Sequence, residues 1–328
     1  MIARAFAILL IGVAAVAPLA ARAQPATPVI GFLSDAAPEA VGSRLSGFQR
    51  GLAEMGFVDG GNVVIEFRGA RGDYDLLPSL AADLVRRKVS VIVTTGSEKV
   101  TRTAKAATGT IPIVATVAGD PVRRGLVASV NRPGGNLTVV SLFTSSDNAL
   151  IAKRVELIHE FVPTATVVGW LVDANILDYE AELQDFRQAA QALGLEAVIA
   201  PVAQDTEIVS AFASFARQGV GALLESGPLI GSHRQQVVAL AARQSIPMLY
   251  EWRDFVRDGG LMSYGTDLAE VFRHAGVYAG RILKGENPGD LPVVQATKVE
   301  LVINVKAAGA LGLEIPPALL VRADEVIE

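Results

Sequence analysis

The side chains that could do chemistry lie in short polar segments, each of which follows an apolar stretch that the pattern predicts as a buried strand. In open parallel sheets, ligands bind beyond the carboxyl ends of the strands. The residues that this rule selects as candidate ligand contacts are Ser34, Thr95, Gly96, Ser97, Asp120, Thr144, Asn175, Glu225 and Tyr250. Their types offer hydrogen bonds and charge pairing to a small polar solute.

One pair of these residues suits an anion. Gly96 and Ser97 precede a predicted helix over residues 98–107, so they offer backbone N–H groups and a hydroxyl at the positive end of the helix dipole. A ligand carboxylate would fit there. Simple N-capping by Ser97 explains the same pattern, and both interpretations can hold together.

Three other positions suit a cation or a ring. Asp120 could pair with a ligand ammonium, or it could be a turn-forming Asx residue before Pro121. Glu225 ends an apolar strand, where a carboxylate needs a partner, and this partner could equally be a salt bridge or a helix end. Tyr250 and Trp252 flank a carboxylate, and their rings could stack on a solute or pack in the core.

Catalytic patterns are thin in this sequence. His159, His233 and His274 lie in predicted helices without metal-ligand spacing, and the chain has no cysteine. It also lacks a nucleophile elbow, a dinucleotide fingerprint and a P-loop, while Gly134 and Gly135 lie in a connecting turn. We therefore expect a binding protein that is not an enzyme and that needs neither cofactor nor metal.

The elements that position these residues alternate between strand and helix. The strands expected in the first half are residues 29–33, 62–67, 89–94 and 111–117, with helices at 44–55, 76–87 and 98–107 between them. After a Gly/Pro/Asn turn at 131–136, a second series of the same kind begins. This order predicts an α/β fold with two doubly wound parallel-sheet lobes that have helices on both faces.

After the second series the pattern predicts an extended segment at 261–264, a helix at 268–283 and a strand at 299–305. We expect each half of the chain to need an element from this last stretch to complete its sheet. The chain is then expected to cross between lobes near 140, 262 and 290, which makes a multi-strand hinge. The expected N-terminal lobe is 24–140 plus about 264–288, and the C-terminal lobe is 141–263 plus about 289–328.

Residues 1–23 have the pattern of a secretory signal peptide. Arg4 is followed by an apolar run over residues 5–20, and Ala21-Arg22-Ala23 forms a small-x-small cleavage site. The run is shorter than the roughly 20 residues that span a bilayer. We expect cleavage between Ala23 and Gln24, and without cysteine we expect no lipid anchor, so the mature protein should be periplasmic.

Composition and charge agree with an ordinary globular protein. The 328 residues are 51% hydrophobic and 19% charged, and the formal net charge is -5. This length allows two domains of about 150 residues each. Lys and Arg do not cluster in runs, so a nucleic-acid partner is not expected.

Longer blocks carry a family resemblance across nearly the whole mature chain. They include YDLLPSLAADLVRRKVSVIV (74–93), GDPVRRGLVASVNRPGGNLT (119–138), IPMLYEWRDFVRDGGLMSYG (246–265) and GVYAGRILKGENPGDLPV (276–293). With these blocks the sequence resembles the ABC-transporter substrate-binding family, whose characterised members include tryptophan/tyrosine-type binders. The resemblance implies a type I periplasmic-binding-protein fold with a ligand cleft between two lobes.

The resemblance also implies a function. We expect a periplasmic solute-binding component of an ABC importer, with an aromatic or branched amino acid as the family-based ligand. Its partners would be the permease and ATPase subunits in the inner membrane, and the protein itself would be a monomer. The alternative is a sensor module that presents its closed form to a membrane receptor, and an enzyme is disfavoured.

Overall fold

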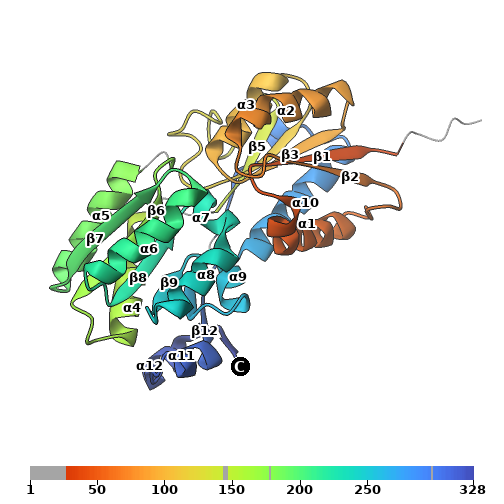
Figure 1. The fold of residues 1–328 in the computed structure, drawn as a ribbon. Coiled ribbons are helices and arrows are strands. Elements are labelled where there is room, and N and C mark those ends of the chain that lie inside the picture. Colours follow the sequence, from red (N-terminus) through yellow and green to blue (C-terminus); the bar gives the residue numbers. More distant parts are fainter. Residues whose placement is uncertain (1–26, 143–146, 177–178, 297) are drawn as a thin grey trace, which may run out of the picture.

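The computed structural model describes residues 27–142, 147–176, 179–296 and 298–328. The predicted signal peptide at 1–23 and the candidate residue Thr144 lie outside the described residues, so both stay predictions. Two lobes, each built on its own sheet, lie side by side (Figure 1). Among the described residues, no helix is long and apolar enough to cross a membrane.

The N-terminal lobe has a six-stranded sheet in the order β11-β5-β4-β3-β1-β2, and every pairing is parallel. The strands are β1 (Val29–Ser34), β2 (Val64–Gly69), β3 (Val91–Thr95), β4 (Ile113–Val117), β5 (Leu137–Ser141) and β11 (Val294–Gln295). The helices are α1 (Gly42–Glu54), α2 (Leu77–Arg86), α3 (Glu98–Ala107) and α10 (Leu268–Leu283). Because helices cover the sheet, all residues of β3, β4 and β5 are buried.

The C-terminal lobe has a seven-stranded sheet in the order β13-β12-β10-β9-β8-β6-β7, in which only the β10–β12 pairing is antiparallel. Its strands are β6 (Val167–Asp173), β7 (Glu196–Val202), β8 (Ala222–Ser226), β9 (Met248–Tyr250), β10 (Met262–Thr266), β12 (Val299–Asn304) and β13 (Glu325–Ile327). Its helices are α4 (Asp147–Phe161), α5 (Tyr179–Ala192), α6 (Ile208–Arg217), α7 (Pro228–Ser232), α8 (Arg234–Arg243), α9 (Arg253–Arg257), α11 (Val305–Ala310) and α12 (Pro317–Arg322). The predicted fold class, two doubly wound α/β lobes, is confirmed.

The chain passes between the lobes three times, and hydrogen bonds join the three crossing segments. The Thr266 hydroxyl donates to the Leu142 carbonyl (2.6 Å), and the Asp267 N–H donates to the Lys298 carbonyl (3.3 Å). The crossings lie a few residues beyond the predicted positions 262 and 290. The reason is strand pairing: β10 stays in the C-terminal sheet through Thr266, whereas β11 pairs with β5 in the N-terminal sheet.

Helix α10 returns from the hinge and packs along α1, although more than two hundred residues separate the two in sequence (Figure 1). Glycines on both helices allow this close approach. A Cβ on Gly51 would overlap the Arg273 carbonyl oxygen, and a Cβ on Gly276 would overlap the Phe48 carbonyl oxygen. These are backbone atoms that cannot turn away, so the contact requires glycine.

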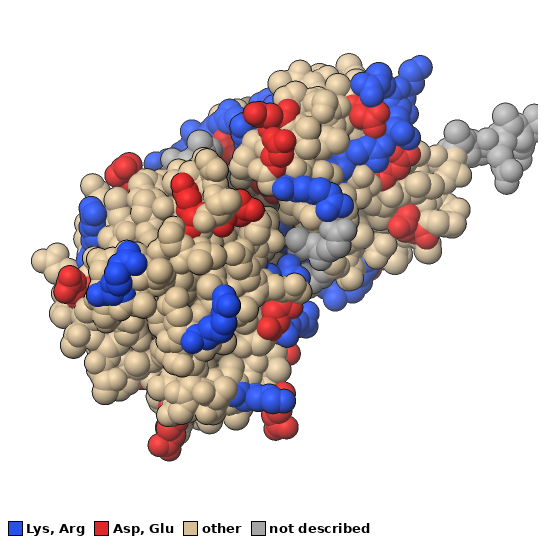
Figure 2. Space-filling view, in the orientation of Figure 1, with Lys and Arg blue, Asp and Glu red and all other residues tan. Residues whose placement is uncertain are grey.

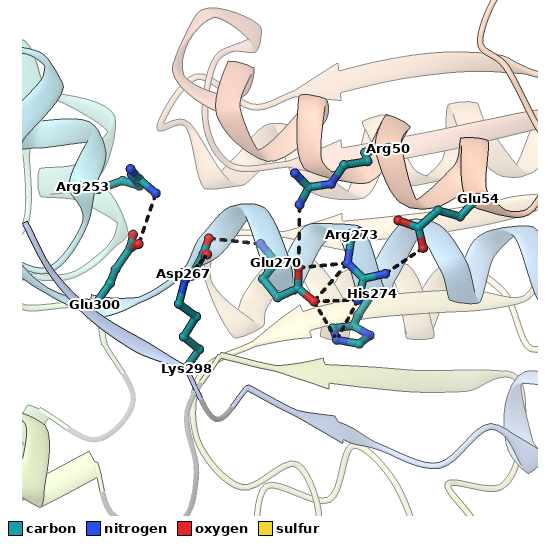
Figure 3. Close-up of polar contacts among 9 residues, drawn as sticks. All are labelled: Arg50, Glu54, Arg253, Asp267, Glu270, Arg273, His274, Lys298 and Glu300. Carbon is teal, nitrogen blue, oxygen red and sulfur yellow. Dashed lines mark hydrogen bonds and ion pairs between the residues drawn. The ribbon is translucent and has the colours of Figure 1, made fainter. Parts of the chain in front are cut away.

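Charged side chains surround this helix pair. Arg273 joins Glu270 of its own helix (2.6 Å) to Glu54 of α1 (2.7 Å), and Arg50 approaches Glu270 at 3.7 Å (Figure 3). Arg50 and Glu54 are largely exposed, so these ion pairs add little to stability. The glycine contact, rather than the charges, determines how closely α1 and α10 pack.

Candidate ligand-binding cleft

A cavity of about 450 Å³ lies between the lobes and takes its lining from both of them. That volume lies in the range of small-molecule sites. It lies where β1 and β3 end in one lobe and where β6, β8 and β9 end in the other. Each lobe thus turns the carboxyl ends of its parallel strands toward the same space.

In the N-terminal lobe the carboxylate of Asp35, directly after β1, caps α3. Asp35 Oδ2 accepts a hydrogen bond from the Ser97 N–H (2.7 Å). Gly96 has a φ of 107°, and a Cβ there would overlap the Asp35 carboxylate, so glycine is required. Burial raises the pKa of the Asp35 carboxyl, while the hydrogen bonds from Ser97 and the charge of Arg44 oppose that rise. The chain's own carboxylate therefore occupies the predicted anion site at α3.

The C-terminal lobe repeats this arrangement. Asp173 ends β6, and its Oδ2 accepts a hydrogen bond from the Leu229 N–H in α7 (3.0 Å). Asn175 donates to the other oxygen, Oδ1, from its backbone (2.9 Å) and from its side chain (3.0 Å). Gly227 has a φ of 110°, and a Cβ there would overlap the Asp173 side chain. Since β6 neighbours β8 as β1 neighbours β3, the two aspartates occupy corresponding places.

Arg44, in the first turn of α1, is the cation best placed to receive a ligand carboxylate. It lines the cavity, and its Nε is buried without a hydrogen-bond partner among the described residues. Burial lowers the pKa of the guanidinium, and the nearby carboxylates of Asp254 and Asp35 oppose that effect. A buried donor without an acceptor costs free energy, so an acceptor on a ligand would bind there favourably.

The two walls of the cavity differ in charge. In the N-terminal lobe the lining holds four cations and two carboxylates: Arg44, Lys99, Arg102, Arg124, Asp35 and Glu98. In the C-terminal lobe the described lining residues include three carboxylates and no cation: Asp173, Glu182 and Glu251. On the face shown in Figure 2, acidic and basic side chains meet along the boundary between the lobes. The cavity therefore has a positive side and a negative side.

Aromatic rings supply the apolar part of the lining. Tyr74, Trp252 and Phe272 all reach the cavity. Trp252 packs against the hydrophobic clusters of both lobes. Burial raises the pKa of the Tyr74 phenol, so this side chain is neutral and can donate a hydrogen bond. Such a surface fits a flat, apolar ligand group.

Four of the residues predicted as ligand contacts line the cavity: Thr95, Gly96, Ser97 and Asn175. Ser34 and Asp120 are not among the lining residues. The Ser34 hydroxyl, fully buried, accepts from the Ala36 N–H (3.0 Å). Asp120 Oδ1 accepts from the backbone of Val122 (2.8 Å) and of Arg123 (3.2 Å), which is the turn-forming alternative.

Glu225 and Tyr250 lie one layer behind the lining. Glu225 Oε1 accepts from the Glu251 N–H (2.8 Å), and Glu251 forms an ion pair with Arg154 (2.9 Å). Burial, together with the nearby charge of Glu251, raises the pKa of Glu225 well above its ordinary value. Tyr250 is 1% exposed and stacks on Phe255, with ring centroids 4.7 Å apart. The packing alternative describes Tyr250, whereas the partner of Glu225 is a backbone N–H instead of the predicted salt bridge or helix end.

The strand-end rule selects loops that border the cavity, but several of the selected residues do not line it. At three places the next residue along the chain lines the cavity instead of the selected one: Asp35 after Ser34, Ser226 after Glu225, and Glu251 after Tyr250. Arg44 and Tyr74 were missed because they lie outside the strand ends. Arg44 did carry one signal, since a cation in the first turn of a helix opposes the helix dipole.

A metal centre has no support in the described part of the chain, where no group of three or more His, Asp or Glu side chains could hold an ion. His233 Nδ1 lies 2.9 Å from the Leu229 carbonyl, and His274 contacts Glu270 at 3.3 Å. Neither side chain lines the cavity.

Comparison with known proteins gives a consistent result. The sequence model of the family described as ABC transporter substrate binding protein matches residues 29–327. The chain is 28% identical over 268 residues to a protein named tyrosine-binding protein from Clostridioides difficile (strain R20291), which covers 82% of this chain and 76% of that one.

Two solved structures of similar sequence differ in how well they superpose. An ABC domain from Streptococcus pneumonia in complex with L-Trp has a TM-score of 0.80 at 27% identity, covering 92% of this chain and all of that one. The ligand-free, open structure of a substrate binding protein from Clostridium difficile has a TM-score of 0.63 at 26% identity, covering 92% of this chain and 99% of that one. As a whole, the chain thus superposes better on the tryptophan complex than on the ligand-free, open structure.

Proposed function

The chain belongs to the ABC transporter substrate binding protein family, and from this premise we propose that it captures an aromatic amino acid between its lobes for import. As a family member it is a substrate-binding protein and not an enzyme. The observation that carries the proposal for the ligand is the opposite charge of the two cavity walls.

A free amino acid is a zwitterion, and it fits a cavity with one positive and one negative side. Its carboxylate would pair with Arg44, whose buried Nε has no acceptor among the described residues. Its ammonium would face the carboxylates of Asp173 and Glu251. A charge-assisted hydrogen bond at each end would hold the ligand in one orientation.

The rings at the cavity support an aromatic side chain on this ligand. Tyr74, Trp252 and Phe272 offer faces and edges on which an indole or a phenol could pack. The names of two relatives support the same choice, because one is a tyrosine-binding protein and the other was solved with L-Trp. A branched aliphatic amino acid would use the charges but would leave the rings without stacking partners.

Such a ligand would also stabilise the closed form. It would contact Arg44 in one lobe and Asp173 in the other only when the lobes are close together. A ligand shifts a conformational equilibrium through the contacts it makes in one state alone. The three hydrogen-bonded crossings near Leu142, Asp267 and Lys298 would serve as the hinge.

For this role we propose a periplasmic location after cleavage near Ala23–Gln24. The partners would be the permease and ATPase subunits of the importer in the inner membrane, and the binding protein would act as a monomer.

A thermal-shift screen of the twenty amino acids on residues 24–328 tests the proposal, followed by calorimetry of the best ligands. At a hundred times its dissociation constant, a ligand adds about 2.7 kcal/mol to the free energy of unfolding. Tryptophan or tyrosine should give the largest shifts. Large shifts with leucine, isoleucine or valine alone would overturn the aromatic assignment and leave the family assignment intact.

A further inference from the structure

A second cavity, of about 660 Å³, lies on the N-terminal lobe between α2 and α3. Its lining is small and apolar along both helices: Pro78, Ala82 and Val85 on α2, with Thr103, Ala106 and Ala107 on α3. We call this cavity the α2–α3 groove. A groove between two helices suits the ridge of a third helix, because helices pack by placing ridges into grooves.

The charged residues that line the α2–α3 groove are all cations. Arg86 is held by Asp83 of its own helix (2.7 Å), and Arg102 is held by Glu98 (2.6 Å). Lys99 is exposed, and among the described residues its ammonium lies over the Tyr74 ring and not beside a carboxylate. An occupant that complements the groove therefore has an apolar stripe of its own and carboxylates beside that stripe.

The α2–α3 groove is joined to the ligand cleft through α3. Lys99 and Arg102 line both cavities. Lys99 Nζ lies 5.0 Å from the centroid of the Tyr74 ring, which faces the ligand cleft. Glu98, the buried first residue of α3, accepts hydrogen bonds from Arg102 (2.6 Å) and from Arg124 (2.9 Å), another residue of the cleft. A ligand that repositions Tyr74 or Arg124 thus changes where two cations of the groove lie.

We propose that the α2–α3 groove is the surface on which the membrane-spanning subunit of the importer docks, through a helical segment with Asp or Glu beside an apolar stripe. The inference rests on the proposed import function. The shared cations single out this partner, because the membrane subunit must distinguish the loaded binding protein from the empty one. A second copy of this chain has no such need.

Site-specific photocrosslinking in cells of the native organism tests whether this surface contacts the membrane subunit. A benzophenone amino acid replaces Ala106 in the groove, and the crosslinked partner is identified by mass spectrometry. Ala216 is the matched control, since each alanine is exposed and is the penultimate residue of its helix, α3 or α6. The probe at Ala106 should crosslink to the membrane subunit of an ABC importer, and the probe at Ala216 should not.

Charge reversal sharpens the test. Arg86→Glu should lower the crosslinking yield at Ala106 roughly tenfold, because charges at the rim of an interface chiefly govern association. Arg217→Glu, at the same last-turn position of α6, should leave that yield unchanged. Both variants should bind the ligand of the purified wild-type protein with unchanged affinity, since neither arginine lines the ligand cleft.

Three outcomes would overturn the proposal: equal crosslinking from Ala106 and Ala216, no crosslink from Ala106, or a crosslink to a second copy or to a receptor of another class. The readout needs no known ligand, so its failure is distinct from failure of the aromatic assignment. A crosslinked importer subunit together with no binding of tryptophan or tyrosine would leave the groove assignment standing and the ligand assignment wrong.

Discussion

The two lobes build the same local structure at the cleft and then differ in what they add to it. In each lobe an aspartate at the end of the first strand caps the helix after the neighbouring strand, over a glycine with positive φ: Asp35 with Gly96, and Asp173 with Gly227. Around this common arrangement the N-terminal lobe adds Arg44 and other cations, whereas the C-terminal lobe adds Glu182 and Glu251. Repeated architecture therefore supplies the frame, and the residues around it supply opposite charges.

The lobes also differ in how the end of the chain completes them. Helix α10 completes the N-terminal lobe by packing on α1 through a backbone contact that only glycine allows. The C-terminal lobe receives two strands, β12 and β13, and the short helices α11 and α12. The first contact should be the more sensitive to substitution, and this difference gives the largest predicted effect.

Gly51→Val should destabilise the N-terminal lobe by about 3 kcal/mol or more, because the new side chain would overlap the Arg273 backbone. Chemical unfolding followed by circular dichroism measures the change. In the C-terminal lobe, Gly309→Ala is the matched helical control. A Cβ there meets nothing within 4 Å, so that variant should be as stable as wild type or slightly more stable. Equal stability of the two variants would contradict the proposed role of the glycine contact.

Arg44→Gln should weaken ligand binding by roughly 100-fold, because the ligand carboxylate would lose a buried charged partner. Isothermal titration calorimetry with the ligand found in the screen measures this change. Arg50→Gln, on the same helix but paired with Glu270 outside the cavity, should bind as wild type does. If Arg44→Gln kept full affinity, Arg44 would not be the partner of the ligand carboxylate.

Asp173→Asn and Asp35→Asn compare the two corresponding carboxylates directly. Loss of the Asp173 charge should weaken binding about tenfold, because it reduces the attraction for the ligand ammonium. Asp35 already faces Arg44 and the amino end of α3, so its neutralisation should change affinity less. In both variants the amide oxygen can still accept the capping hydrogen bond, but at position 173 the amide nitrogen then replaces the oxygen that accepts from Asn175. A larger effect at Asp35 would reverse the proposed ligand orientation.

Glu225→Gln should flatten the dependence of stability on pH. Burial raises the folded-state pKa of Glu225 well above 4.5, so the folded protein keeps a proton that the unfolded chain releases. The stability that this group contributes is present below about pH 4.5 and is lost as the pH rises through the folded-state pKa. Urea titrations between pH 4 and 8 on both proteins measure it. Identical pH profiles would mean that Glu225 does not hold this proton.

Much of the fold could be predicted because strand and helix periodicity is local. The short apolar runs and the helices that end at glycine gave the doubled series of elements. The positions of the crossings depend on which strands pair with β10 and β11. Strand pairing is a property of the assembled sheet and not of the local sequence. The run Leu261 to Tyr264 therefore predicted a strand but not how far it extends in the C-terminal lobe.

The place of the cavity at the strand ends follows from the sequence pattern, but the residues that line it do not. The rule for parallel sheets located the loops. Whether Ser34 or Asp35 faces the cavity depends on the residue at which side chains stop alternating between the two faces of the sheet. Gly96 was selected as part of an anion site, yet its positive φ accommodates the carboxylate of Asp35 from another loop. That contact spans 62 residues of sequence, and no local pattern encodes it.

Calorimetric titration of residues 24–328 with three related compounds tests the central claim, that lobes of opposite charge hold a zwitterion, most directly. Tryptophan carries both charges, tryptamine lacks the carboxylate, and indole-3-propionate lacks the ammonium. Tryptophan should bind, and each analogue should bind roughly 100-fold more weakly because one wall loses its charged partner. Binding of either analogue as tightly as tryptophan would contradict the account.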